Sequence, residues 1–213
     1  MTRVSCNRSL GMMSVVGGLI LASVIAPRLG AQNLGPFRQL LALEGSYQRL
    51  QLDAGEGSDR VGLDGYGVRL WINLAPFSGP RPNLIDKTAI ALAYSTTFRG
   101  DDQIGTRQYG AELNMYPLHV PIANLIDPFL ILGAGAFRID NRNNTSVVDG
   151  AFAAGSRSYF AFSPGLGIRI PIPNRLQLRL EARDLILFNR RDGSGDSRTS
   201  QSPQFMAGAG LTF

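Results

Sequence analysis

Period-two alternation of apolar and polar residues is the feature that most constrains this chain. The clearest alternating runs cover residues 66–74, 90–98, 109–115, 160–170 and 176–182. Weaker runs cover Leu41–Leu52, 129–139 and 205–213. Successive side chains of a β-strand point to opposite faces, so each run predicts a strand with one apolar face. The sequence therefore predicts an all-β protein of eight strands.

The connections between these runs alternate in character. Four connections are rich in Asp, Gly, Ser, Asn and Arg: 53–60, 99–105, 141–157 and 189–203. The other three are rich in proline and partly apolar: 75–86, 117–127 and 171–174. Transmembrane barrels have short periplasmic turns and longer extracellular loops. The pattern predicts an antiparallel up-and-down meander with its four polar loops outside the cell.

Residues 1–31 have the pattern of a secretory signal peptide. Arg3 and Arg8 precede a mostly apolar stretch over residues 10–26, and Ala31 provides a small residue before Gln32. A retained membrane helix would need about 20 apolar residues, and this run is shorter. We expect cleavage after Ala31, then a short periplasmic lead over 32–40 and a barrel domain over 41–213.

Charge and reactive residues exclude several classes of protein. The formal net charge is +5, but residues 1–31 contain three arginines and no acid, so the remainder is nearly neutral. A nucleic-acid partner is therefore not expected. The single cysteine, Cys6, lies in the predicted signal peptide, and the single histidine is His119. We expect no cofactor and no metal site.

The end of the chain favours a membrane barrel over a soluble one, because alternation alone does not decide which face is buried. Phe205, Leu211 and Phe213 alternate with small residues up to an aromatic last position. This ending resembles the C-terminal assembly signal of bacterial outer-membrane barrels, which the insertion machinery reads. A closed barrel pairs every backbone group internally, as a bilayer requires.

The run from Pro128 to Gly135, the strand from Leu176 to Arg183 and the aromatic ending resemble the family of small outer-membrane barrels typified by the membrane domain of OmpA and by OmpX. The resemblance covers about residues 41–213. It implies an eight-stranded antiparallel transmembrane β-barrel in the bacterial outer membrane. The partners it implies are outer-membrane lipid, lipopolysaccharide and the insertion machinery, while the partner of the loops stays open.

Six charges fall on the interleaved, lumen-facing side of the predicted strands: Glu44, Glu112, Glu181, Arg69, Arg169 and Arg179. Buried charges persist when they are paired, and the two signs are equal in number here. The six residues predict an interior salt-bridge network that fixes the register of the strands. The alternative is a gate or ion-selective constriction in the lumen, and one network can serve both roles. In strand 129–139, inward glycines place Leu130 and Leu132 toward lipid and turn Phe137 inward.

Three functions from different classes follow. We expect a non-enzymatic structural or surface-interaction barrel whose narrow lumen is plugged by charged side chains. The alternative is an OmpW-like barrel that transports or binds a small apolar solute through a lateral opening. A lipid-A-modifying enzyme is less favoured, because such barrels use a histidine with a serine near the outer leaflet, whereas His119 lies in a predicted periplasmic connection.

Overall fold

The computed structural model describes residues 40–53, 60–77, 84–98, 104–117, 122, 126–141, 155–172, 175–191 and 197–213. The predicted signal peptide 1–31, the lead up to residue 39 and His119 lie outside the described residues, so their interpretation stays a prediction. The strands are β1 (Leu41–Leu52), β2 (Val61–Asn73), β3 (Thr88–Phe98), β4 (Ile104–Met115), β5 (Asp127–Asn141), β6 (Gly155–Ile172), β7 (Leu176–Arg191) and β8 (Ser197–Thr212).

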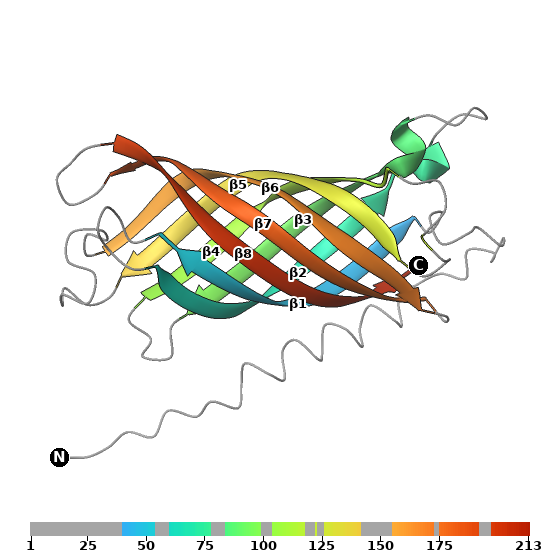
Figure 1. Cartoon of the computed structure of the whole chain (residues 1–213), viewed down its shortest axis with the longest axis horizontal. Coiled ribbons are helices and arrows are strands. Elements are labelled where there is room, and N and C mark those ends of the chain that lie inside the picture. The colour runs from blue at the N-terminus through green and yellow to red at the C-terminus, as the bar shows by residue number, and fades with distance from the viewer. Residues whose placement is uncertain are drawn as a thin grey trace, which may run out of the picture. The chain divides into compact units, whose positions relative to one another are not determined.

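The eight strands form one closed antiparallel barrel (Figure 1). Each strand pairs with the next in the chain, and β1 pairs with β8, so that Leu43 lies opposite Leu211 and Arg49 lies opposite Phe205. This closure leaves no unpaired sheet edge. The predicted fold, an eight-stranded up-and-down meander, is confirmed.

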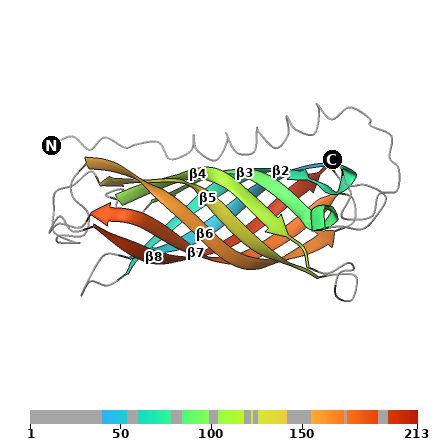
Figure 2. The same cartoon turned by 90° about the horizontal axis from the view of Figure 1, so that it is seen from above.

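The two ends of the barrel differ. The 3-10 helices η1 (Ala75–Phe77) and η2 (Leu84–Lys87) lie at the same end as the C-terminus (Figures 1 and 2). We call this the terminal end; β1 starts here, at Leu41. At the opposite end, the loop end, β1, β3, β5 and β7 finish and the next strand along the chain begins. No helix in the described part of the chain is long and apolar enough to cross a membrane.

The predicted fourth polar loop, residues 189–203, is wrong in its extent. Strand β7 continues to Arg191 and β8 begins at Ser197. The alternation in β8 persists, but it is carried by polar side chains: Ser200, Ser202 and Gln204 are buried in the lumen. A pattern defined by large apolar side chains therefore ends before the strand does. The third loop is likewise shorter than predicted, because β6 begins at Gly155.

Two irregularities interrupt the ladder. The pairing of β7 with β8 shifts between Leu187 and Arg190, where Asn189 has φ 54°. Asparagine tolerates this left-handed conformation better than most residues, and such bulges bend a strand. Between β6 and β7 the pairing passes from Phe162 to Gly165, and the intervening Ser163 and Pro164 have no partner on β7; the proline has no N–H to donate.

The outward face of the barrel carries an apolar belt. It includes exposed aliphatic side chains such as Leu70, Leu92, Leu132, Leu166 and Leu180. Its exposed aromatic side chains are Tyr47, Tyr66, Tyr94, Phe98, Tyr109, Phe160, Phe188 and Phe205. Several of them touch across strands, with ring centroids 5.9 Å apart for both Tyr47–Tyr66 and Phe160–Phe188. An outward apolar band with aromatic residues is the surface that a bilayer requires of a barrel.

The belt ends abruptly on the side of the loop end. On β1 the outward residue after Tyr47 is Arg49, and on β4 the outward residue beyond Tyr109 is Arg107. On β5, leucines at 130 and 132 face outward while Phe137 is buried, so the predicted phase of this strand is confirmed. Arg138 follows on the same outward face. The strands thus continue past the belt into a polar outer surface.

The lumen is not polar throughout, which corrects the expected interior. At the loop end a few buried hydroxyl side chains, such as Ser200 and Ser202, share it with a larger apolar cluster. The cluster consists of Leu50, Leu52, Val61, Leu63, Ile104, Phe137, Ile139, Ala161, Leu185 and Leu187. On β1, β2, β4 and β5 the outer face at this level is polar, so the two faces of these strands exchange character above the belt, whereas Ile186 and Phe188 keep the outer face of β7 apolar. A barrel segment that is surrounded by water buries its apolar face inside, as any soluble barrel does. The expectation was wrong because it assumed that the outer face is apolar, and the lumen polar, along the whole length of every strand.

Candidate functional site

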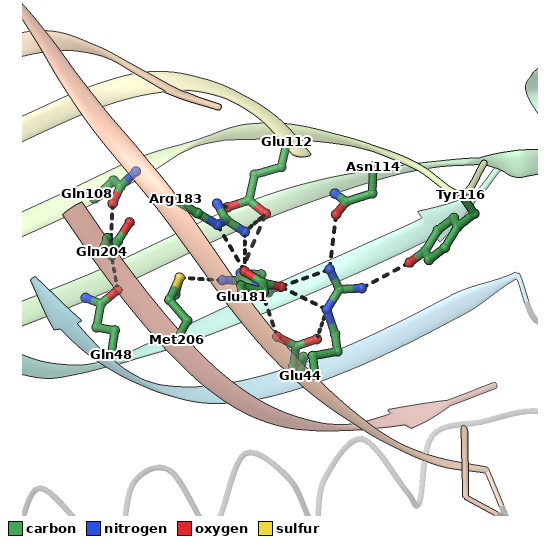
Figure 3. A network of polar contacts seen from close by, with 12 residues as sticks. Glu44, Gln48, Gln108, Glu112, Asn114, Tyr116, Glu181, Arg183, Gln204 and Met206 are labelled. Carbon is green, nitrogen blue, oxygen red and sulfur yellow. Dashed lines mark hydrogen bonds and ion pairs between the residues drawn. The ribbon is translucent and has the colours of Figure 1, made fainter. Parts of the chain in front are cut away.

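Three carboxylates and three guanidinium groups meet in the middle of the lumen. We call Glu44, Glu112, Glu181, Arg69, Arg179 and Arg183 the charged band. Figure 3 shows that side chains from β1, β4 and β7 converge there. Each of the six residues is at most 6% exposed. These side chains point into the lumen because successive residues of a strand face opposite sides, and the residues next to them in sequence lie on the outer face.

Glu181 connects all three arginines. Its Oε1 lies 2.7 Å from Nη1 of Arg69 and 2.9 Å from Nη2 of Arg179. Its Oε2 accepts hydrogen bonds from Nη2 of Arg183 at 2.6 Å and from Nε of Arg183 at 3.0 Å. One carboxylate therefore holds three guanidinium groups in a fixed arrangement.

The other two carboxylates complete the pairing. Glu112 on β4 accepts two hydrogen bonds from Arg183 on β7, at 2.5 and 2.9 Å, in the bidentate geometry that suits a guanidinium group. Glu44 on β1 lies 3.0 Å from Nη1 of Arg69 and 3.1 Å from Nε of Arg179. Charges of opposite sign are thus equal in number, and the band joins strands from opposite sides of the barrel.

Aromatic rings enclose the band toward the terminal end. The guanidinium carbon of Arg179 lies 4.0 Å from the ring centroid of Phe129 and 4.2 Å from that of Trp71. Arg179 also donates to the side-chain oxygen of Asn114 at 3.0 Å and to the hydroxyl of Tyr116 at 3.1 Å. Cation–π contacts of this kind stabilise a desolvated guanidinium group.

The sequence-predicted residues do not all meet. Glu44, Arg69, Glu112, Arg179 and Glu181 lie in the charged band, whereas Arg169 lies apart and pairs with Asp127, 2.6 Å from Nη2 to Oδ2. Arg183 and Asp127 were missed. Arg183 continues the inward phase of Gln177, Arg179 and Glu181 by one more step, so extending that alternation would have found it.

The lumen on either side of the band is closely filled. Toward the loop end, Gln204 donates to the side-chain oxygen of Gln48 at 2.7 Å (Figure 3). The apolar cluster lies beyond this pair. Toward the terminal end, Trp71, Tyr116 and Arg179 line a pocket of about 30 Å³. That volume holds roughly one or two water molecules.

The last strand closes the barrel at the terminal end. The backbone N–H of Phe213 donates to the carbonyl of Leu41 at 2.8 Å, which ties the last residue to the first residue of β1. Phe205 is exposed on the outer face, and Leu211 and Phe213 are half-buried. The predicted assembly residues thus lie on the outer side of the closing strand, and their role in assembly stays a prediction.

Replacing Phe213 with alanine is expected to slow insertion into the membrane, because it removes the aromatic group at the end of the closing strand. Thr212→Ala serves as the matched control, since its side chain makes one exposed hydrogen bond, to the carbonyl of Arg175. Pulse-chase measurement of the folded, heat-modifiable form in cells reports the rate. Equal rates for the two variants would contradict a role of Phe213 in assembly.

The chemistry available in the described residues is limited. They contain no group of three or more His, Cys, Asp or Glu side chains that is placed to hold a metal ion. The carboxylates of the charged band are all held by arginines. The arrangement is suited to fixing strands and blocking the lumen.

The chain matches no family model and no curated protein. Among solved structures, it is similar to Neisserial surface protein A (NspA), with a TM-score of 0.55 and 11% identity over 81% of this chain and 96% of that one. It also matches the N-terminal barrel of OprF from Pseudomonas aeruginosa (TM-score 0.47, 12% identity, 81% and 97% covered). Ail of Yersinia pestis gives a TM-score of 0.42 and 15% identity, with 82% and 97% covered.

These observations define the class of protein. The eight-stranded closed barrel is the fold of small bacterial outer-membrane proteins such as NspA. Its exposed apolar belt is the surface that a barrel presents to lipid. The chain has the fold of the small bacterial outer-membrane β-barrels, so the predicted resemblance is confirmed at the level of the fold.

Proposed function

We propose that this protein is a non-enzymatic barrel with a structural or surface-interaction role, whose lumen is plugged. The loop end faces the outside of the cell, where its loops contact an external partner. The apolar belt contacts outer-membrane lipid and lipopolysaccharide, and the last strand contacts the insertion machinery during assembly.

The single observation that carries the plugged lumen is the charged band. Its six side chains meet across the lumen, are almost fully buried and balance in charge. A conducting pore needs a continuous water-filled path, and an eight-stranded interior is just wide enough to be filled by side chains. The apolar cluster beyond the band supports a second block, because large buried side chains such as Leu63, Phe137 and Leu185 fill the lumen there, beside the buried hydroxyl groups of Ser200 and Ser202.

Planar-bilayer recordings of the unmodified protein are expected to show no steady, large conductance. Replacing both Glu112 and Arg183 with serine removes a bidentate pair from the band without leaving a net charge, and we expect it to admit at most a small leak, because the apolar cluster remains. The matched control replaces outward Arg49 and Asp64 with serine and should stay silent. A large conductance from the unmodified protein would overturn the plugged lumen.

Two observations favour a second candidate, the barrel that binds a small apolar solute. The loop-end half of the lumen contains a large apolar cluster, and the pairing of β6 with β7 is interrupted at Ser163 and Pro164. Against it, Leu50, Leu63, Leu185 and Leu187 are fully buried and pack against one another. Saturable binding of a radiolabelled alkane that is abolished by Leu63→Trp, with the fold retained, would favour this candidate.

A further inference from the structure

Two arginines stand side by side on the outer wall of the barrel. Arg107 on β4 and Arg138 on β5 are direct cross-strand partners. Both side chains point outward, and they are 51% and 43% exposed. Like charges directly opposite each other on one face of a sheet destabilise the pair unless an anion compensates them.

Their level on the barrel is that of lipid head groups. Tyr109 lies two residues from Arg107 on the same outward face, and it is an exposed aromatic residue of the apolar belt. Ala136, Ala134 and Leu132 continue the belt below Arg138. Aromatic residues mark the boundary between the hydrocarbon and the head groups, so the two guanidinium groups lie just beyond that boundary.

The carboxylate of Asp140 contacts both arginines. Asp140 accepts a hydrogen bond from Nε of Arg138 at 3.0 Å, and its other oxygen lies 3.8 Å from Nε of Arg107. Both contacts use the Nε atoms. The terminal Nη atoms of the two guanidinium groups add four further N–H donor nitrogens on this exposed part of the wall. The three side chains carry a net charge of +1, and the two guanidinium groups are exposed, which suits a further anion.

We propose that Arg107 and Arg138 form a binding site for a phosphate group of an outer-leaflet lipid A. A guanidinium group binds phosphate in a bidentate manner, and two adjacent ones surround a doubly charged group. The acyl chains of the same molecule lie along the belt beside Tyr109 and Leu132. This inference rests on the proposed contact with lipopolysaccharide and names the residues that recognise it.

Binding of bisphosphorylated lipid A to the full chain, folded in dodecyl maltoside micelles, is measured by native mass spectrometry. A basic side chain at a membrane surface contributes about 1 kcal/mol, so Arg107→Gln and Arg138→Gln are each expected to weaken binding about fivefold. Asp140→Asn removes the competing carboxylate and is expected to tighten binding about fivefold by the same conversion. A merely structural role of the cluster predicts no gain from Asp140→Asn.

Arg49→Gln is the matched control, because Arg49 is also an exposed outward arginine beyond the belt, on β1. It should change binding less than twofold, because the cross-strand partner of Arg49 on β2 is Asp64 and not a second arginine. An equal loss in Arg49→Gln, equal binding of fully dephosphorylated lipid A, or displacement of lipid A by an equal concentration of inorganic phosphate would overturn the proposal. The heat-modifiable gel shift verifies that each variant is folded. Conductance of the barrel, which tests the plugged lumen, is measured separately and has no bearing on this result.

Discussion

Replacing Glu181 with leucine is expected to lower the free energy of unfolding by about 3–5 kcal/mol, the range for breaking a buried ion pair on one side. Glu181 contacts Arg69, Arg179 and Arg183, all of which are buried. Without it, three guanidinium groups share two carboxylates in a closed lumen. Urea titration of the barrel in lipid vesicles, followed by the gel shift of the folded form, measures the change.

A compensating variant separates charge balance from packing. Combining Glu181→Leu with Arg183→Met restores equal numbers of carboxylates and guanidinium groups in the band. Buried ion pairs replaced together by apolar residues are often tolerated, so the double variant is expected to be more stable than Glu181→Leu alone. If both variants have the same free energy of unfolding as the unmodified protein, the lumen is hydrated and the charged band does not stabilise the fold.

Arginine at Leu180 is expected to destabilise the inserted barrel by about 2–4 kcal/mol, the range for a charge near the bilayer midplane. Leu180 is 50% exposed on the outer face, and its neighbours across the strands are Ile168 and Ala207, which also face outward. The same vesicle titration reports the effect, because the guanidinium group leaves water only when the barrel inserts.

Gln51→Arg provides the control for this prediction. Gln51 also faces outward, but it lies beyond Arg49 on the polar part of β1. The cost there should fall to about 0–1 kcal/mol, since lipid-facing charges are tolerated near the interfaces. Equal effects at Leu180 and Gln51 would mean that the assigned apolar belt does not lie in the hydrocarbon.

The number of strands and their phase could be predicted from the sequence, because both are local properties. A side chain's face depends only on its parity along the strand, so Glu44, Arg69 and Glu112 could be assigned to the lumen without knowing their partners. The bounds of β1, Leu41–Leu52, also follow from the alternation. These predictions needed only the chain and the constraint that hydrocarbon places on its outer face.

The partners within the lumen were decided by the tertiary structure. Glu112 pairs with Arg183, 71 residues away in sequence, and Arg169 pairs with Asp127 outside the charged band. Which charges meet depends on the stagger of the closed barrel, a quantity that no single strand contains. The juxtaposition of Arg107 and Arg138 likewise exists only once β4 and β5 are in register.

At the loop end, the local sequence pattern predicts the strand but does not determine which of its faces is buried. The sequence determined an alternating strand at Leu50 and Leu52, but only the depth of the bilayer decides which face of such a strand is buried in protein. Inside the belt, lipid covers the apolar face and the polar face turns to the lumen. Beyond the belt, water covers the outer wall, and the same alternation places Leu50, Leu52 and Leu63 inside.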